Sequence, residues 1–218
     1  MKRLIAPLAF TVSLLLAGSA LARGIDVDKV NGSIHIDGDQ QAGDLSTVNG
    51  GIRVDNGGSA EKVSTVNGGI ELGDHVSVDS VETVNGGIEL GQNARVARAV
   101  EAVNGGIQLG HGAEIAGRAS NVNGRITLDG AHVGGGIETV SGDVEIGANS
   151  RVEGGLLVEK PHGFSWGKNR NPRIVIGPHA VVEGTLDFRR EVDLYVSDTA
   201  KVGTITGANP QKFSGDHP

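Results

Sequence analysis

The 218-residue chain contains no cysteine, few aromatic residues and little proline. The absence of cysteine excludes disulfides, thiolate metal sites, a cysteine nucleophile and a lipid-modified N-terminal cysteine. Aromatic residues make up 3% of the chain, and the apolar residues are mostly valine, isoleucine, leucine and alanine. This composition favours a narrow core of small, β-branched side chains over a globular core built on large rings.

Basic residues are also in the minority, with 19 against 26 acidic residues. Lys2 and Arg3 precede an apolar run over residues 4–17, and an Ala-Leu-Ala cleavage motif ends at Ala22. This pattern predicts a signal peptide over residues 1–22, and the run is too short for a stable membrane span. After cleavage 17 basic residues remain, and the net charge near −9 argues against nucleic acid or an anionic membrane surface as partner. We expect an exported protein, periplasmic or at the cell surface, with no membrane span.

Glycine is abundant, at 36 residues, and it recurs at fixed offsets within a Val-Asn-Gly motif. The asparagines of this motif are Asn31, Asn49, Asn67, Asn85, Asn104 and Asn123, and Ser141 takes the same place in the next repeat. Successive positions are 18, 18, 18, 19, 19 and 18 residues apart. A fixed period of this length is typical of solenoids.

Each period divides into three six-residue pieces, and the fourth reads VNGGIE, LGQNAR and VARAVE from Val84 onward. The first and fifth positions of each piece are aliphatic or small, so we expect them to face inward. Three pieces then form a three-sided coil of about 18 residues, and coils stack at the strand spacing of ~4.8 Å. The sequence therefore predicts an all-β fold, a single-stranded β-solenoid (a three-sided parallel β-helix) over residues 23–207. The crossover rule favours a right-handed coil, but left-handed acyltransferase helices share the six-residue pattern, so handedness stays open.

Histidines recur at one corner of the coil. The third corner position is His75, Asn93, Gly112, His132, Asn149 and His179 in successive coils. These residue types tolerate a left-handed backbone, so we interpret the histidines as corner residues. His75 and His132 lie three coils apart, about 14 Å on the strand spacing, and no metal site or cofactor is expected.

The repeated asparagines suggest a second structural feature. An asparagine before glycine favours a turn, and stacked copies could pass amide hydrogen bonds from coil to coil as a structural ladder. The one arrangement that resembles catalytic chemistry is Glu71 and Glu89 in neighbouring coils, with Arg53 before them. Exposed single carboxylates usually only increase solubility, so no catalytic residues are predicted.

The repeat is interrupted once, by an insertion at residues 159–173. A solenoid insertion must leave the stack as a surface loop, and such loops often bind partners. Phe164, Trp166, Lys168 and Arg170 are therefore candidate contacts to a ligand or partner. The alternative is that the aromatic residues fold back over the rod. The tail, residues 208–218, is expected either to cap the last coil through Phe213 or to fray.

Two segments carry a resemblance to known families. The TVNGGI and TVSGDV segments starting at Thr83 and Thr139 resemble the adhesin family of secreted bacterial β-strand repeats. The segment IVIGPHAVVEGTL starting at Ile174 resembles the bactofilins, which are polymer-forming β-helices with a three-sided coil. Together the resemblance covers residues 25–207 and implies a right-handed β-helix. Bactofilins are cytoplasmic, and the predicted signal peptide departs from that family.

These observations predict a non-catalytic, exported β-helix that serves as an adhesin-like, scaffold or interaction module of the bacterial cell envelope. Its partner would be a protein or a glycan. A self-assembling, bactofilin-like polymer that associates through its coil ends is the alternative. A polysaccharide-acting β-helix enzyme and a left-handed acyltransferase are less favoured, because the chain offers no convergent set of chemical groups.

Overall fold

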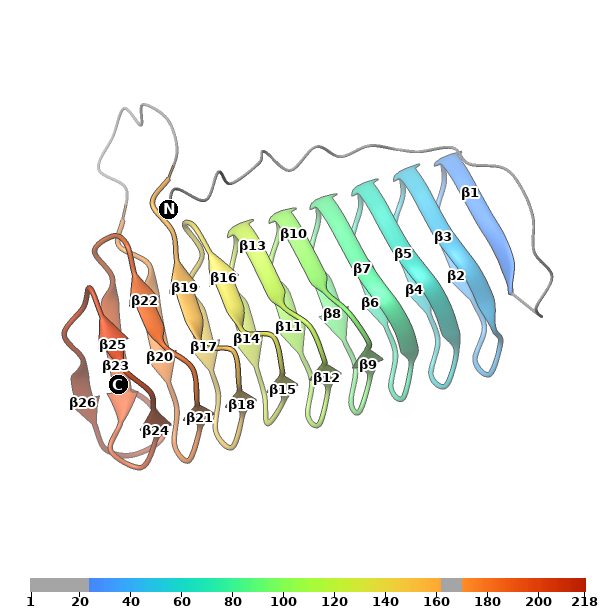
Figure 1. Ribbon diagram of the computed structural model, residues 1–218. Coiled ribbons are helices and arrows are strands. Elements are labelled where there is room, and N and C mark those ends of the chain that lie inside the picture. Colours follow the sequence, from blue (N-terminus) through green and yellow to red (C-terminus); the bar gives the residue numbers. More distant parts are fainter. Residues whose placement is uncertain (1–23, 162–169) are drawn as a thin grey trace, which may run out of the picture.

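The computed structural model describes residues 24–161 and 170–218. These residues form 26 β-strands stacked into a rod (Figure 1), which confirms the predicted all-β solenoid. The predicted signal peptide and three candidate contacts, Phe164, Trp166 and Lys168, lie outside the described residues. In the described part of the chain, no helix is long and apolar enough to cross a membrane.

One parallel sheet takes a single short strand from each coil, ten in total. Its strands are β2 (Ile34–Ile36), β4 (Ile52–Val54), β6 (Ile70–Leu72), β8 (Ile88–Leu90), β11 (Ile107–Leu109), β14 (Ile126–Leu128), β17 (Val144–Ile146), β20 (Arg173–Ile176), β23 (Asp193–Ser197) and β26 (Gln211–Phe213). Most of these strands have two buried ends and an exposed or half-buried middle residue, as the alternation of strand side chains requires. The middle residues therefore form a row along the outside of the rod.

The second sheet changes character along the rod. Its first strands are long: β1 (Ile25–Asn31), β3 (Ala42–Asn49), β5 (Ser59–Asn67) and β7 (Ser77–Asn85). Beyond β7 two rows of shorter strands continue it. One row is β9 (Arg95–Val96), β12 (Glu114–Ile115), β15 (His132–Val133), β18 (Arg151–Val152), β21 (Val181–Val182) and β24 (Lys201–Val202); the other is β10 (Val100–Asn104), β13 (Ala119–Asn123), β16 (Ile137–Thr139), β19 (Leu156–Val158), β22 (Leu186–Phe188) and β25 (Ile205–Thr206).

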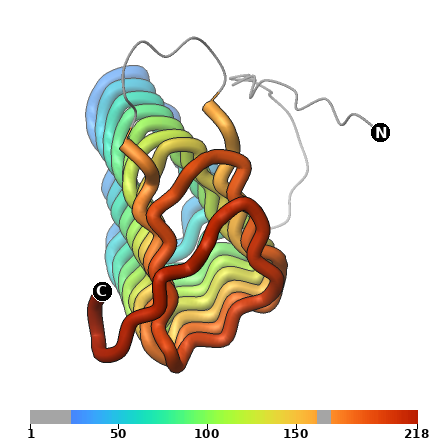
Figure 2. Tube along the Cα trace, turned by 90° about the vertical axis from the view of Figure 1, so that its left-hand side faces the viewer, coloured from blue at the N-terminus to red at the C-terminus, as the bar shows by residue number. Residues whose placement is uncertain are grey.

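One extra residue explains this change. The buried Val78 and Val81 of β7 are paired with Val96 and Val100 of the next coil, so a spacing of three residues becomes four. The additional residue allows the chain to bend between β9 and β10. The predicted three-strand coil is therefore found from β9 onward, whereas the earlier coils have two strands. The view along the axis shows the third corner in the later coils (Figure 2).

The interior contains the predicted column of isoleucines. Ile52, Ile70, Ile88 and Ile107 are paired in register, and none is more than 2% exposed. This confirms the prediction that the repeats share one dry interior.

The prediction for the valine of the Val-Asn-Gly motif was wrong. Val30 is 68% exposed, and Val48 and Val122 are each 37% exposed. The preceding threonine faces inward instead, because successive strand residues point to opposite sides. Thr83 is buried, and its hydroxyl donates a hydrogen bond to the carbonyl oxygen of Gly68 in the preceding coil (3.1 Å). Thr47 and Thr65 make the equivalent bond.

The predicted left-handed corner is confirmed at His75, Asn93 and His179, whose φ angles are 58°, 55° and 57°. His132 was wrongly included. This corner is one residue shorter than its neighbour, so Gly130 takes the left-handed position with a φ of 53° and His132 begins β15.

The two ends of the rod differ. At the N-terminal end β1 has a partner on one side only, and Ile25 and Val30 of this strand are exposed. At the other end the tail contributes β26, which pairs with β23, so the ten-stranded sheet continues to Phe213.

Candidate functional site: a groove along the ten-stranded sheet

A groove of about 490 Å³ lies over β2, β4, β6 and β8. It is lined by the second glycine of successive repeats, including Gly51 and Gly69, and by the outward middle residues of the four strands. These middle residues are His35, Arg53, Glu71 and Glu89. The groove exists because the glycines at the corner have no side chains, whereas the middle residues of the adjoining strands have long side chains that project from the surface.

The middle residues stack in register, so the structure brings together the three charged residues that the sequence singled out. Arg53 pairs with Glu71 across neighbouring strands, and Glu71 pairs with Glu89. The Arg53 guanidinium lies 2.5 Å from Glu71 Oε1, and its Nε donates a hydrogen bond to Asp55 Oδ1 at 2.9 Å. The hydrogen bond to Asp55, followed by the charge of Glu71, raises the pKa of Arg53.

The two stacked carboxylates differ from the pair that hydrolyses glycosides. In such enzymes one carboxyl group acts on each side of the scissile bond. Glu71 and Glu89 instead project from the same face of adjacent strands, whose backbones lie about 4.8 Å apart. Glu71 also forms an ion pair with Arg53. This arrangement is suited to hydrogen bonding and charge contacts with a bound partner.

At the start of the groove His35 meets two carboxylates. Its Nε2 atom lies 3.3 Å from Asp37 Oδ1 and 3.2 Å from Asp55 Oδ2. This cluster was not predicted from the sequence, because His35 lies outside the left-handed corner position at which histidine recurs. The detectable signal was His35-x-Asp37 followed, one coil later, by Asp55 at the position equivalent to Asp37.

The asparagine ladder runs along the corner beside the groove. Each Nδ2 donates to Oδ1 of the asparagine in the preceding coil, over 2.9–3.1 Å, from Asn31 through Asn49, Asn67, Asn85 and Asn104 to Asn123. The glycine after each asparagine lets adjacent coils approach closely. A Cβ atom at Gly68 would lie 2.0 Å from the carbonyl oxygen of Gly50. The ladder thus fixes the spacing of the coils that form the groove.

The insertion is anchored by charged groups at its base. Arg170, the described member of the candidate contacts, donates from Nη2 to Asp143 Oδ2 at 2.8 Å. The backbone N–H of Arg173 donates to the other oxygen of Asp143, also at 2.8 Å. Burial raises the pKa of Asp143, but the bonds from Arg170 and Arg173 outweigh burial, and the net pKa is lowered.

A second anchor lies beside the insertion. Arg189 Nη1 is 2.6 Å from a carboxylate oxygen of the buried Glu159. The hydrogen bonds to Asp187 and then to Glu159 raise the pKa of Arg189. Arg190 reaches across to the carbonyl oxygen of Val140 at 3.0 Å. The Arg189–Glu159 pair binds one end of the insertion to a later coil, and the Arg190 bond connects segments before and after the insertion.

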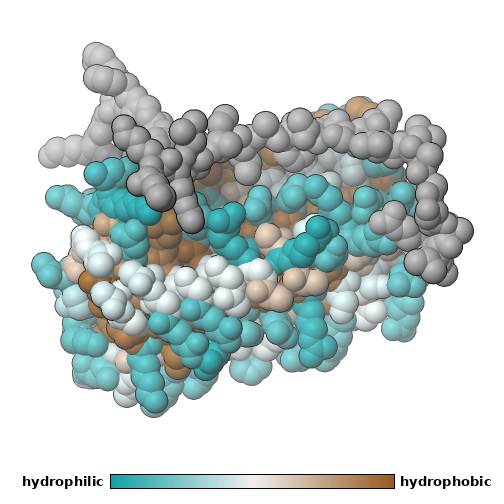
Figure 3. All heavy atoms as spheres, in the orientation of Figure 1, coloured by the Kyte–Doolittle hydropathy of each residue, from teal (hydrophilic) through white to brown (hydrophobic). Residues whose placement is uncertain are grey.

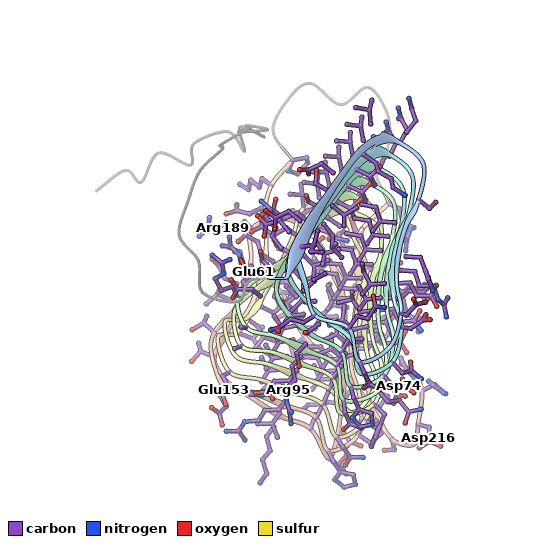
Figure 4. All side chains as sticks on the ribbon, turned by 90° about the vertical axis from the view of Figure 1, so that its right-hand side faces the viewer. Glu61, Asp74, Arg95, Glu153, Arg189 and Asp216 are labelled. Atoms are coloured by element: carbon purple, nitrogen blue, oxygen red, sulfur yellow. The ribbon has the colours of Figure 1, made fainter. Side chains whose placement is uncertain are left out.

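The remaining described surface carries polar, charged and some apolar residues. On the face shown in Figure 3, hydrophilic residues project from the rod and apolar residues are visible between them. The labelled charged residues, among them Glu61, Arg95 and Glu153, lie around the outside of the coils (Figure 4). A smaller hollow of about 240 Å³ lies over β16, β19 and β22 and is lined partly by the ion pair between Arg118 and Glu138 (2.9 Å).

Comparisons with protein-family models, curated proteins and solved structures found no match. The β-solenoid is therefore established by the structure, and no family is identified.

Proposed function

We propose that this protein is an exported, non-catalytic interaction scaffold of the bacterial cell envelope, which binds an extended protein or glycan partner along its side. The observation that carries this proposal is the groove over β2, β4, β6 and β8, with glycine and in-register polar side chains repeated from coil to coil. A partner with its own repeat could meet the same contacts in several coils. Many weak contacts of this kind add to a useful affinity.

The proposal of a non-catalytic role is supported by the pairing and the solvent exposure of the charged groups in the groove. Arg53 and Glu71 form an ion pair, and their side chains are 53% and 50% exposed. Catalytic carboxylates usually lie in sites where burial shifts their pKa values. The exposed pair in the groove is instead typical of a surface that recognises polar groups.

A glycan array and a pull-down from envelope extracts, both with residues 23–218, test the proposal. Arg53→Ala removes the central groove charge, and Trp166→Ala removes the candidate contact on the insertion. Arg95→Ala is the matched control, since Arg95 is exposed on the other sheet. We expect capture to weaken with Arg53→Ala and to persist with Arg95→Ala. Loss with Trp166→Ala alone would place binding on the insertion.

Two outcomes would overturn the proposal. If neither assay captures a partner, the protein is not an interaction module of this kind. If a captured polysaccharide is cleaved, the protein is an enzyme, and the stacked Glu71 and Glu89 become its first candidates.

A self-assembling polymer is the second candidate, favoured by the one-sided pairing of β1 and the 82% exposure of Ile25. Unpaired strand edges promote association between chains. However, the two-strand coils at the N-terminal end do not match the three-strand coils near the C-terminal end, which disfavours head-to-tail stacking. Concentration-dependent filaments in electron micrographs that disappear with Ile25→Lys would establish the polymer; a monomer at all concentrations would remove it.

A further inference from the structure

We propose that His35, Asp37 and Asp55 bind one divalent transition-metal ion, of the kind represented by Zn²⁺. The three residues offer one imidazole nitrogen and two carboxylate oxygens, and these atoms all lie within 4.8 Å of one another. Imidazole and carboxylate are the nitrogen and oxygen ligands found in zinc sites with an open position. This site is separate from the asparagine ladder and from the insertion.

Two of the three ligand–ligand distances are close to those around a shared ion, and the two aspartate oxygens lie within 4.8 Å of each other. In a tetrahedral site with metal–ligand bonds of about 2.0–2.2 Å, neighbouring ligand atoms are about 3.3–3.6 Å apart. His35 Nε2 lies 3.3 Å from Asp37 Oδ1 and 3.2 Å from Asp55 Oδ2. The side chains of Asp37 and Asp55 are 72% and 36% exposed, which leaves Asp37 in particular free to adjust toward an ion.

Proton counting supports the same conclusion. Both carboxylate oxygens face the same nitrogen, and a neutral imidazole has at most one hydrogen on that atom. A single N–H could reach both oxygens only as a shared three-centre hydrogen bond, whereas a cation bound by the nitrogen lone pair would contact both oxygens directly.

Neighbouring groups orient the ligands. Arg53 Nε donates to Oδ1 of Asp55, which leaves Oδ2 directed toward His35. Gln40 Nε2 contacts Oδ2 of Asp37 and leaves Oδ1 toward His35. Such outer contacts fix ligand carboxylates in metal sites. The positive charge of Arg53 is offset by Glu71, so with neutral His35 the group retains two negative charges to balance a divalent ion.

The repeat itself sets these coils apart. Asp37 and Asp55 occupy a position that is Gly73, Gly91 and Gly110 in the next three coils. Asp129 occupies it again further along, but the outward residue two positions before is Thr127 in place of histidine. His35 also lines the groove, so the remaining coordination position of the ion would face a bound partner.

His132 provides a natural comparison. It also lies between two carboxylates, but Glu114 is nearest to Nδ1 (3.7 Å) and Glu153 to Nε2 (3.2 Å). The two ring nitrogens point in different directions, so one ion cannot contact the imidazole and both carboxylates. His132→Ala and Asp129→Asn are therefore matched controls for substitutions in the proposed site.

The test is calorimetric titration of tag-free residues 23–218 with Zn²⁺ after chelation and dialysis. We expect one ion per chain, and at least about tenfold weaker binding with His35→Ala and with Asp55→Asn. His132→Ala and Asp129→Asn should bind as the unmodified protein does. Bound Zn²⁺ should also raise the melting temperature of the unmodified protein but not that of His35→Ala.

Circular dichroism shows whether each variant remains folded, which is expected because the side chains are exposed. A protein that binds no Zn²⁺, or that binds it equally after His35→Ala, would overturn the proposal. Binding lost with His132→Ala and retained with His35→Ala would overturn it too.

Discussion

The coils before Leu90 and those after it differ in the number of strands and in the contacts that hold neighbouring coils together. Before Leu90 each coil has two strands, and its corner is closed by identical threonine, asparagine and glycine contacts. Later coils have three strands, and beyond Asn123 the ladder gives way to ion pairs such as Asp143–Arg170 and Glu159–Arg189. At the regular corner each asparagine bonds to its copy in the adjacent coil, whereas Arg190 reaches a residue 50 positions back.

The difference teaches how a solenoid tolerates irregularity. Identical residues stacked at one coil's spacing can bond directly to their own copies, as the asparagines do. An insertion removes that possibility, because the next coil no longer has an identical residue in place. Long arginine side chains then bridge the gap: Arg170 and Arg189 stay about half exposed or more, while their carboxylate partners Asp143 and Glu159 are mostly buried.

The largest expected effect is in the regular corner. Gly68→Ala would place a methyl group 2.0 Å from the Gly50 carbonyl oxygen, whereas Gly69→Ala would place one 3.4 Å from the Gly87 oxygen. We expect Gly68→Ala to lower the free energy of unfolding by about 3 kcal/mol or more, and Gly69→Ala by less than about 1 kcal/mol. Urea unfolding followed by circular dichroism measures both. If both substitutions lowered the free energy of unfolding equally, the coils would have to move apart easily enough to accommodate the methyl group at Gly68.

The second prediction concerns the insertion's anchor. Asp143 has a pKa lowered in the folded protein, so its contribution is complete above the unfolded value of about 4 and is lost as the pH falls through the folded pKa. Asp143→Asn should lower the free energy of unfolding by about 2 kcal/mol at pH 7. The difference from the unmodified protein should shrink below pH 4.

Melting temperatures measured from pH 7 to pH 2 test this prediction. Asp216→Asn, in the exposed tail, is the control and should follow the unmodified protein throughout. A difference for Asp143→Asn that stays constant with pH would mean that the ionised carboxylate is not what holds the insertion.

The third effect is smaller and tests the ladder. Asn85→Ala removes two amide hydrogen bonds, one to Asn67 and one from Asn104, whereas Asn31→Ala removes one at the ladder's end. We expect losses of about 1–2 and about 0.5–1 kcal/mol, because each exposed hydrogen bond contributes modestly. Urea midpoints provide the measurement. If Asn31→Ala were the more harmful change, the stacked-bond account would be wrong.

The smallest effect is expected at the buried threonines. Thr83→Val keeps the shape of the side chain but removes the hydroxyl that donates to the Gly68 carbonyl oxygen. We expect a loss of about 0.5–1 kcal/mol. Ala102, in register in the next three-strand coil, shows that the position can lack a hydroxyl. A loss above about 3 kcal/mol would show that the hydroxyl is essential to the two-strand coils.

Much of the fold could be predicted because the period is visible in the residues themselves. The isoleucine column and the left-handed His75 follow directly from repeated positions. The inward threonine was not predicted because the neighbouring valine is more apolar. Alternate residues of a strand face opposite sides, and the sequence does not show which of the two faces the interior. The long strands before Leu90 were missed because a single extra residue, hidden in the 19-residue periods, controls the bend.

The candidate site was less predictable than the fold. Arg53, Glu71 and Glu89 were recognisable because they share one position in successive repeats. His35, Asp37 and Asp55 come from two different positions of the repeat, and their proximity depends on where β2 ends. The repeat period alone cannot show which side chains from different positions of the repeat contact each other.

The spacing between paired strands has a consequence for how the molecule is made. Partners such as Ile70 and Ile88 are 18 residues apart, and even across the insertion Val144 and Ile174 are only 30 apart. That lengthening adds about 0.5 kcal/mol of loop-closure entropy. A chain that emerges N-terminus first can therefore complete each coil on the one already formed, long before its last residues arrive.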